Sequence, residues 1–101
     1  MPSGSPFSIG LAISERDGTT REVSLSGESI LIGSGPSAVL RLEDSDVSSI
    51  HAVVKLTPEK TATIIDLGSE TGTTVNGCAV SDPVALAIGD EIAIGRIRLV
   101  V

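Results

Sequence analysis

The feature that most constrains the fold is a series of short apolar runs, each closed by a turn signal, with no helical period. In the first run Phe7, Ile9, Leu11 and Ile13 alternate with smaller or polar residues, and this period of two predicts a strand with one buried face. About eleven short strands at regular spacing predict an all-β sandwich or barrel. The predicted strands are 7–14, 20–25, 29–32, 39–42, 50–56, 61–66, 73–75, 78–80, 84–87, 91–94 and 96–101.

Glycine-containing turns separate these runs. Asp17-Gly18 and Asn76-Gly77 each lie between two predicted strands, where such pairs favour a two-residue hairpin. At 33–36, Gly-Ser-Gly-Pro ends the third strand, since glycine and proline do not continue it. This segment lacks the Lys-Ser/Thr ending of a nucleotide loop, so a tight turn is the default interpretation.

Composition predicts one domain with an aliphatic core. The chain has 101 residues, 41% of them hydrophobic, and Phe7 is its single aromatic residue. This length suffices for one small sandwich. We expect residues 1–6 to form a flexible tail ahead of a domain at 7–101. Cys78 is expected to be a small core residue.

The charge of the chain restricts its partners. A formal net charge of −6 disfavours nucleic acid and anionic membrane surfaces, which repel an acidic domain. No apolar run approaches the roughly 20 residues that span a bilayer, so direct membrane insertion is not expected. The lone cysteine cannot form an internal disulfide, which favours the cytoplasm. The chain is expected there alone or as the cytosolic domain of a larger membrane-associated protein.

Ser48 and His51 are the pair that invites a hydrolase interpretation. Nucleophilic catalysis needs a base on the serine hydroxyl and a third group that orients this base. A Ser-x-x-His spacing does not supply that geometry, so we expect His51 to pin a loop through a hydrogen bond. We predict no enzyme activity. One His and one Cys are too few for a zinc site, the acidic loop at 43–46 lacks the EF-hand pattern, and no metal or cofactor is predicted.

The ordered set of loop motifs is more specific than any one of them, and it covers nearly the whole chain from Phe7 onward. It closely resembles the forkhead-associated (FHA) domain, whose pattern runs Gly-Arg, Ser-x-x-His, Ser-x-Asn-Gly-Thr, a second Asn-Gly turn, and Gly-Asp before the last strands. The matching segments here are Ile32-Gly33, 48–51 (Ser-Ser-Ile-His), 66–77 (Asp-Leu-Gly-Ser-Glu-Thr-Gly-Thr-Thr-Val-Asn-Gly) and 88–92 (Ile-Gly-Asp-Glu-Ile).

The resemblance implies an eleven-stranded sandwich of the SMAD/FHA type, whose apical loops bind phosphothreonine peptides. Ser48 stands at the position of the family's phosphate-binding serine, and Asn76-Gly77 matches the hairpin beside the site. The residues assigned to ligand binding are Ser34, Gly35, Ser48, Ser49, Glu70, Thr71 and Asn76. The residues assigned to shaping the loops are Gly33, His51 and Gly72.

The departures from the family pattern concern the phosphate and the main chain of the ligand. Ser34 stands where the family has its phosphate-binding Arg, and Thr71 stands where it has the Asn that holds the ligand main chain. A phosphothreonine carries about −1.5 to −2 charges, and losing a hydrogen bond to a charged group costs about 1.5–3 kcal/mol. Glu70 adds a negative charge, and Ser49 replaces the Arg, Lys or Asn often found there. We therefore expect tight phosphate recognition to be compromised.

The function predicted from these observations is a protein–protein interaction module with weak or no dependence on phosphothreonine. By analogy with divergent members of the family, its setting is a cytosolic scaffold part of a bacterial secretion or motility assembly. One alternative is a phosphothreonine-peptide-binding signalling module that uses Ser48, Ser49 and loop backbone amides. The second alternative is self-association through an exposed strand edge or an aliphatic patch.

Overall fold

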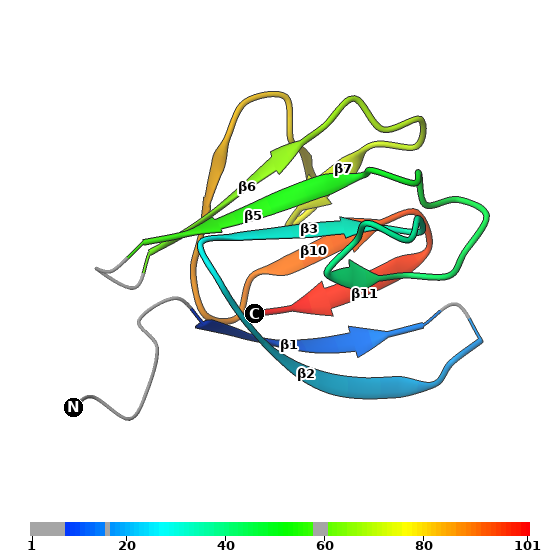
Figure 1. Ribbon diagram of the computed structural model, residues 1–101, viewed down its shortest axis with the longest axis horizontal. Helices are drawn as coiled ribbons and strands as arrows, with labels where there is room; N and C mark the ends of the chain where they lie inside the picture. The colour runs from blue at the N-terminus through cyan, green and yellow to red at the C-terminus, as the bar shows by residue number, and fades with distance from the viewer. Residues whose placement is uncertain (1–7, 16, 58–60) are drawn as a thin grey trace.

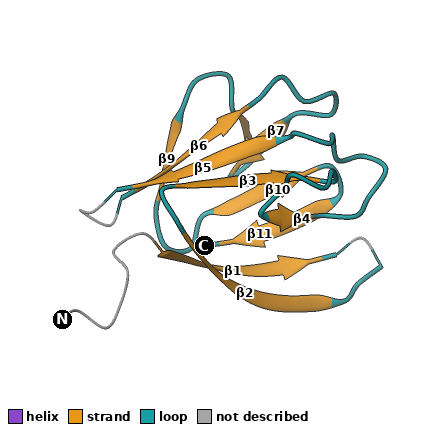
Figure 2. Ribbon diagram, viewed as in Figure 1, coloured by secondary structure: helices purple, strands orange, loops and turns teal. Residues whose placement is uncertain are grey.

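The computed structural model describes residues 8–15, 17–57 and 61–101, and in them it contains strands and no helix (Figure 2). The predicted tail at 1–6, together with Phe7, lies outside the described residues. The described chain has no helix able to span a membrane. The strands are β1 (Ser8–Ser14), β2 (Thr20–Ser26), β3 (Ser29–Gly33), β4 (Leu40–Arg41), β5 (Ala52–Leu56), β6 (Ala62–Asp66), β7 (Thr73–Val75), β8 (Cys78–Ala79), β9 (Val84–Leu86), β10 (Glu91–Ile94) and β11 (Ile97–Val100).

These strands form two sheets that face each other, so the prediction of an all-β sandwich with about eleven strands is confirmed. One sheet has six strands in the order β2-β1-β11-β10-β7-β8, and the other has five in the order β4-β3-β5-β6-β9. The pair β3–β4 is parallel, and the other pairs of neighbours are antiparallel. The first strand lies beside the last, with Ala12 opposite Val100 (Figure 1).

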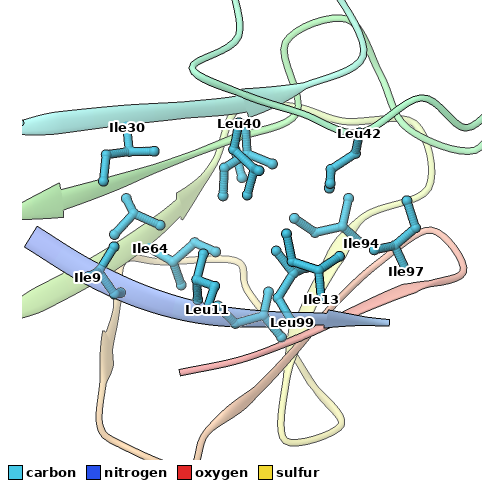
Figure 3. Packing of buried hydrophobic residues seen from close by; sticks show 14 of the residues in the cluster. Ile9, Leu11, Ile13, Ile30, Leu40, Leu42, Ile64, Ile94, Ile97 and Leu99 are labelled. Carbon is cyan, nitrogen blue, oxygen red and sulfur yellow. The ribbon is translucent and has the colours of Figure 1, made fainter. Parts of the chain in front are cut away.

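The core between the sheets is aliphatic. Along β1 the side chains of Ile9, Leu11 and Ile13 are 8%, 3% and 0% exposed, whereas their neighbours are exposed, as a period of two requires. They face residues of the five-stranded sheet such as Ile30 and Ile64 (Figure 3). The largest fully buried apolar side chains are Ile13, Ile30, Ile32, Leu42, Ile64, Ile92, Ile94, Ile97, Leu99 and Val54.

The core prediction for Cys78 is wrong, because its side chain is exposed. Cys78 lies in β8, a two-residue strand at the edge of the six-stranded sheet, where both residues are exposed. It pairs with Val75, which is buried. In the same predicted run Val80 is buried, so the burial of Cys78 depends on the place of β8 at the sheet edge, which the sequence pattern does not reveal.

Candidate functional site

Three loops meet at one end of the sandwich, at the right in Figure 1. They connect β3 to β4, β4 to β5, and β6 to β7. Between them lies a cavity of about 260 Å³, which we call the apical cavity, and it contains five of the predicted ligand-binding residues. The lining residues are Ser34, Ser45, Asp46, Val47, Ser48, Ser49, Glu70 and Thr71.

His51 holds two of these loops together from inside. Its side chain is 0% exposed. The backbone N–H of Ser48 donates to Nδ1 at 3.1 Å, so the ring proton is on Nε2, which donates to the carbonyl of Gly72 at 2.9 Å. Backbone groups therefore use both ring nitrogens. A nucleophile–base pair needs the serine hydroxyl on the imidazole, and the ring of His51 bonds elsewhere.

Two glycines let the first loop lie directly against the second. A Cβ atom at Gly33 would overlap the backbone of Ser49, with the carbonyl carbon only 2.8 Å away, and one at Gly35 would meet Ser49 at 3.1 Å. In this contact the N–H of Ser34 donates to the carbonyl of Ser48 at 3.0 Å, and that of Gly35 donates to Ser49 at 3.2 Å. Glycine is required here for close approach.

At the two positions that depart from the family pattern, 34 and 71, the side-chain hydroxyls donate their hydrogen bonds within the protein. The Ser34 hydroxyl donates to the carbonyl of Val47 at 2.8 Å, and the Thr71 hydroxyl donates to the carbonyl of Asp46 at 2.6 Å. A hydroxyl has a single proton to donate. In this conformation Ser34 and Thr71 brace the loop at 45–49, and neither presents a donor to the cavity.

Ser48 is placed differently. Its hydroxyl oxygen accepts the backbone N–H of Glu70 at 3.1 Å, which ties the second loop to the third. An acceptor keeps its own proton, so the Ser48 hydroxyl retains one donor for a ligand. Ser49, beside it on the cavity wall, is exposed.

The charge at the apical cavity is negative. Asp46 and Glu70 are in its wall, and the eight lining residues include no basic side chain. Arg96, from the turn between β10 and β11, pairs with Asp46 at 3.3 Å. Arg41 bonds through Nε to the carbonyl of Ser34 at 3.1 Å, but it lies outside the lining.

Asn76 is separated from the other predicted ligand-binding residues. It follows β7, whereas the loop at 67–72 precedes that strand, so the two lie at opposite ends of β7. Its amide donates to Asp90 at 3.0 Å and accepts the N–H of Glu91 at 3.1 Å. Hydrogen bonds from the N–H of Ala87 and from Asn76 lower the pKa of Asp90. The structure gives Asn76 a role in joining two turns.

Asp66 orders the third loop, although no sequence motif gave it a role. At the end of β6, its carboxylate accepts the N–H groups of Gly68 and Ser69 and the hydroxyls of Ser69 and Thr73, at 2.6–3.2 Å. Burial by itself raises the pKa of Asp66, but the hydrogen bonds from these three residues outweigh it and lower the pKa below its ordinary value. An aspartate directly before a Leu-Gly-Ser turn is the sequence signal for such a role.

We expect Asp66→Ala to lower the free energy of unfolding by roughly 1–2 kcal/mol at pH 7, because several hydrogen bonds to a charged group are lost. A lowered folded-state pKa stabilises the fold above the unfolded value of about 3.9, and the contribution disappears as the pH falls through the lower folded value. The difference between variant and wild type should therefore shrink below about pH 4. Urea titrations from pH 7 to pH 2.5, with exposed Asp82→Ala as control, measure it. A difference that persists unchanged at pH 2.5 would contradict this account.

Comparison with known proteins gives consistent matches over this region. The FHA domain family model matches residues 30–95. The FHA domain-containing protein FhaA of Mycobacterium tuberculosis is 38% identical over 85 residues, which are 84% of this chain and 16% of that protein. The chain thus spans about a sixth of this relative.

Solved structures agree with the fold. The FhaA FHA domain complexed with the intracellular domain of Rv3910 is 34% identical, with a TM-score of 0.77 and coverage of 89% of this chain and 97% of that one. A second structure, from a study of phosphothreonine-dependent FHA domain interactions, is 34% identical with a TM-score of 0.78, covering 91% and 94%.

Proposed function

The chain belongs to the FHA domain family, a family of protein–protein interaction modules, and from this membership we propose that it binds its protein partner with weak or no dependence on phosphothreonine. The apical cavity is the binding site in this proposal. The observation that carries it is the internal use of the Ser34 and Thr71 hydroxyls, which donate to Val47 and Asp46.

Charge supports the same proposal. Phosphate is held best by charge-assisted, bidentate donors such as a guanidinium. The lining of the cavity contains two carboxylates and no guanidinium. A phosphate entering this cavity approaches Glu70 and an Asp46 carboxylate that already pairs with Arg96, and it gains neutral hydrogen bonds from Ser48 and Ser49. An unphosphorylated segment with hydroxyl or amide groups meets the same donors without the repulsion.

The weak dependence on phosphothreonine can be tested by titrating the labelled domain with phosphothreonine peptides and with their twins, which are peptides of the same sequence without the phosphate. We expect affinities that differ by less than about 10-fold between twins, or about 1.4 kcal/mol. Micromolar binding that is lost on dephosphorylation would overturn the proposal.

Phosphothreonine recognition through Ser48 is the second candidate, because the Ser48 hydroxyl keeps a free proton at the cavity. Under this alternative, Ser48→Ala abolishes phosphopeptide binding in the same titration. Under our proposal, it changes binding of the phosphorylated and unphosphorylated twins by similar factors.

For the cellular setting we propose a cytosolic scaffold part of a bacterial secretion or motility assembly. The support is analogy with divergent FHA domains and the bacterial source of the relative above. Recovery of the protein in the exported fraction of bacterial cells would contradict this setting.

A further inference from the structure

The outer edge of β2 is a pairing surface that the apical site does not use. β2 is the first strand of the six-stranded sheet and pairs with β1 along seven consecutive residues without a bulge. It lies at the lower rim of the sandwich in Figure 1. Among the described residues, the other three sheet edges are strands of two or three residues. β2 is therefore the one long edge.

The hydrogen-bonding pattern shows which backbone groups of β2 face outward. The N–H of Glu15 donates to the carbonyl of Thr19 at 2.8 Å, so this opposed pair is hydrogen-bonded. Bonded and non-bonded pairs alternate along an antiparallel ladder. Residues 21, 23 and 25 therefore bond to β1, and the backbone groups of Thr20, Glu22, Ser24 and Ser26 point away from it. All four of these residues are exposed.

Arg21, opposite the buried Ile13, is the one inward-facing charge on this edge, and no other feature of β2 blocks pairing. Natural edges are blunted by proline, bulges, lysine or inward charges, and β2 contains no proline, glycine or lysine. Its one basic side chain, Arg21, bonds to Glu15 at 3.1 Å and reaches the carbonyl of Arg41 at 3.4 Å. That guanidinium is held against its own domain.

The geometry points to a second copy of this chain as the partner, with the two β2 strands antiparallel about a dyad at Val23. Val23 is the middle residue of β2, so this register pairs all seven residues. It places Thr20 opposite Ser26, Arg21 opposite Leu25 and Glu22 opposite Ser24. The outward-facing residues become the hydrogen-bonded pairs, and the two sheets join into one.

Charge favours this register over its two neighbours and is compatible with two identical strands. Moving the dyad to Glu22 sets two glutamates opposite each other, and moving it to Arg21 sets two arginines opposite each other, both of which are unfavourable. With the dyad at Val23 neither charge lies directly opposite its like, and the two Glu22 residues are diagonal neighbours. The partly buried Val23 and Leu25 gain cover from the partner strand, which adds apolar burial to the backbone bonds.

Disulfide trapping tests the register. In a Cys78→Ser background, Val23→Cys places two thiols at the dyad, where a non-hydrogen-bonded pair has a Cα separation of about 4.5 Å, within disulfide reach. Ser24→Cys is the control, because its two copies are offset along the strands and lie roughly 8 Å apart. We expect crosslinking of Val23→Cys at least 10-fold faster. Equal rates, or faster crosslinking of Ser24→Cys, would overturn the register.

Sedimentation of the unmodified chain tests the dimer itself. Ser24→Pro removes an outward N–H and leaves the hydrogen bonds between β2 and β1 intact. The variant should therefore remain folded by circular dichroism, and the dissociation constant of its dimer should be at least 10-fold higher than that of the wild type. Wild type that stays monomeric up to about 1 mM, or a folded Ser24→Pro variant that dimerises equally well, would overturn the proposal. Pairing that appears only with another protein's strand would overturn it also.

Discussion

Replacing Gly33 with alanine is expected to lower the free energy of unfolding by about 3 kcal/mol or more, since backbone overlap exceeds ordinary overpacking. Gly33 is buried, and the added Cβ would lie 2.8 Å from the carbonyl carbon of Ser49 and 3.0 Å from the carbonyl oxygen of Ser48. These are backbone atoms, so no side-chain rotation relieves the overlap. The loops have to separate, and the hydrogen bond from Ser34 to Ser48 at 3.0 Å is lost with them.

Gly10→Ala is the matched control for this prediction. Gly10 is also a strand glycine, but a Cβ there meets nothing within 4 Å, so the change should leave stability within about 1 kcal/mol or raise it slightly. Chemical denaturation of both variants measures the two effects. Equal losses for Gly33→Ala and Gly10→Ala would show that the close contact between the loops does not matter.

The double variant Ser34→Arg with Thr71→Asn is expected to gain roughly 10- to 100-fold in affinity for phosphothreonine peptides. One charge-assisted hydrogen bond contributes about 1.5–3 kcal/mol, and a guanidinium at position 34 offers two to a phosphate. The change also releases the carbonyls of Val47 and Asp46 from their present donors. A small loss of stability should therefore accompany the gain.

Ser37→Arg is the control for charge alone, because Ser37 is exposed in the same loop but outside the cavity lining. Fluorescence polarisation with one phosphopeptide and its unphosphorylated twin compares the variants. The double variant should gain more for the phosphorylated peptide than for its unphosphorylated twin, because the guanidinium at position 34 contributes only when the phosphate is present. An equal gain from Ser37→Arg would mean that net charge, and not placement, governs binding.

Much of the fold follows from local sequence signals. The alternation in 7–14 and the Asp-Gly and Asn-Gly pairs are short-range features, and the strands they predict agree with β1, β2, β7 and β8 to within one or two residues. Pairing that depends on distant residues is not encoded locally. The parallel contact of β4 with β3 and the exposure of Cys78 depend on which strands end up at the sheet edges.

The sequence predicted which residues lie on the apical rim, but it did not predict the hydrogen bonds that they make. Sequence motifs indicated that Ser34, Ser48 and Thr71 belong to one rim, and the structure brings them to one cavity. The hydroxyls of Ser34 and Thr71 donate to the backbone carbonyls of Val47 and Asp46, and the Ser48 hydroxyl accepts the backbone N–H of Glu70. Every residue has these backbone groups, so the sequence does not indicate which of them a side chain will bond. The direction in which Arg41 extends from its strand, toward Ser34, likewise depends on the packed loop.

The pairing of β1 with β11 governs when the domain can fold during synthesis. The six-stranded sheet cannot close until the last residues of the domain leave the ribosome, since β11 separates β1 from β10 in the sheet. Contacts between distant residues slow folding. Until the five-stranded sheet forms over it and β11 pairs with it, the β1–β2 hairpin is an isolated ribbon, marginal in water, with Ile9, Leu11 and Ile13 uncovered. A chain that ends before β11 therefore leaves the edge of β1 unpaired, which favours aggregation.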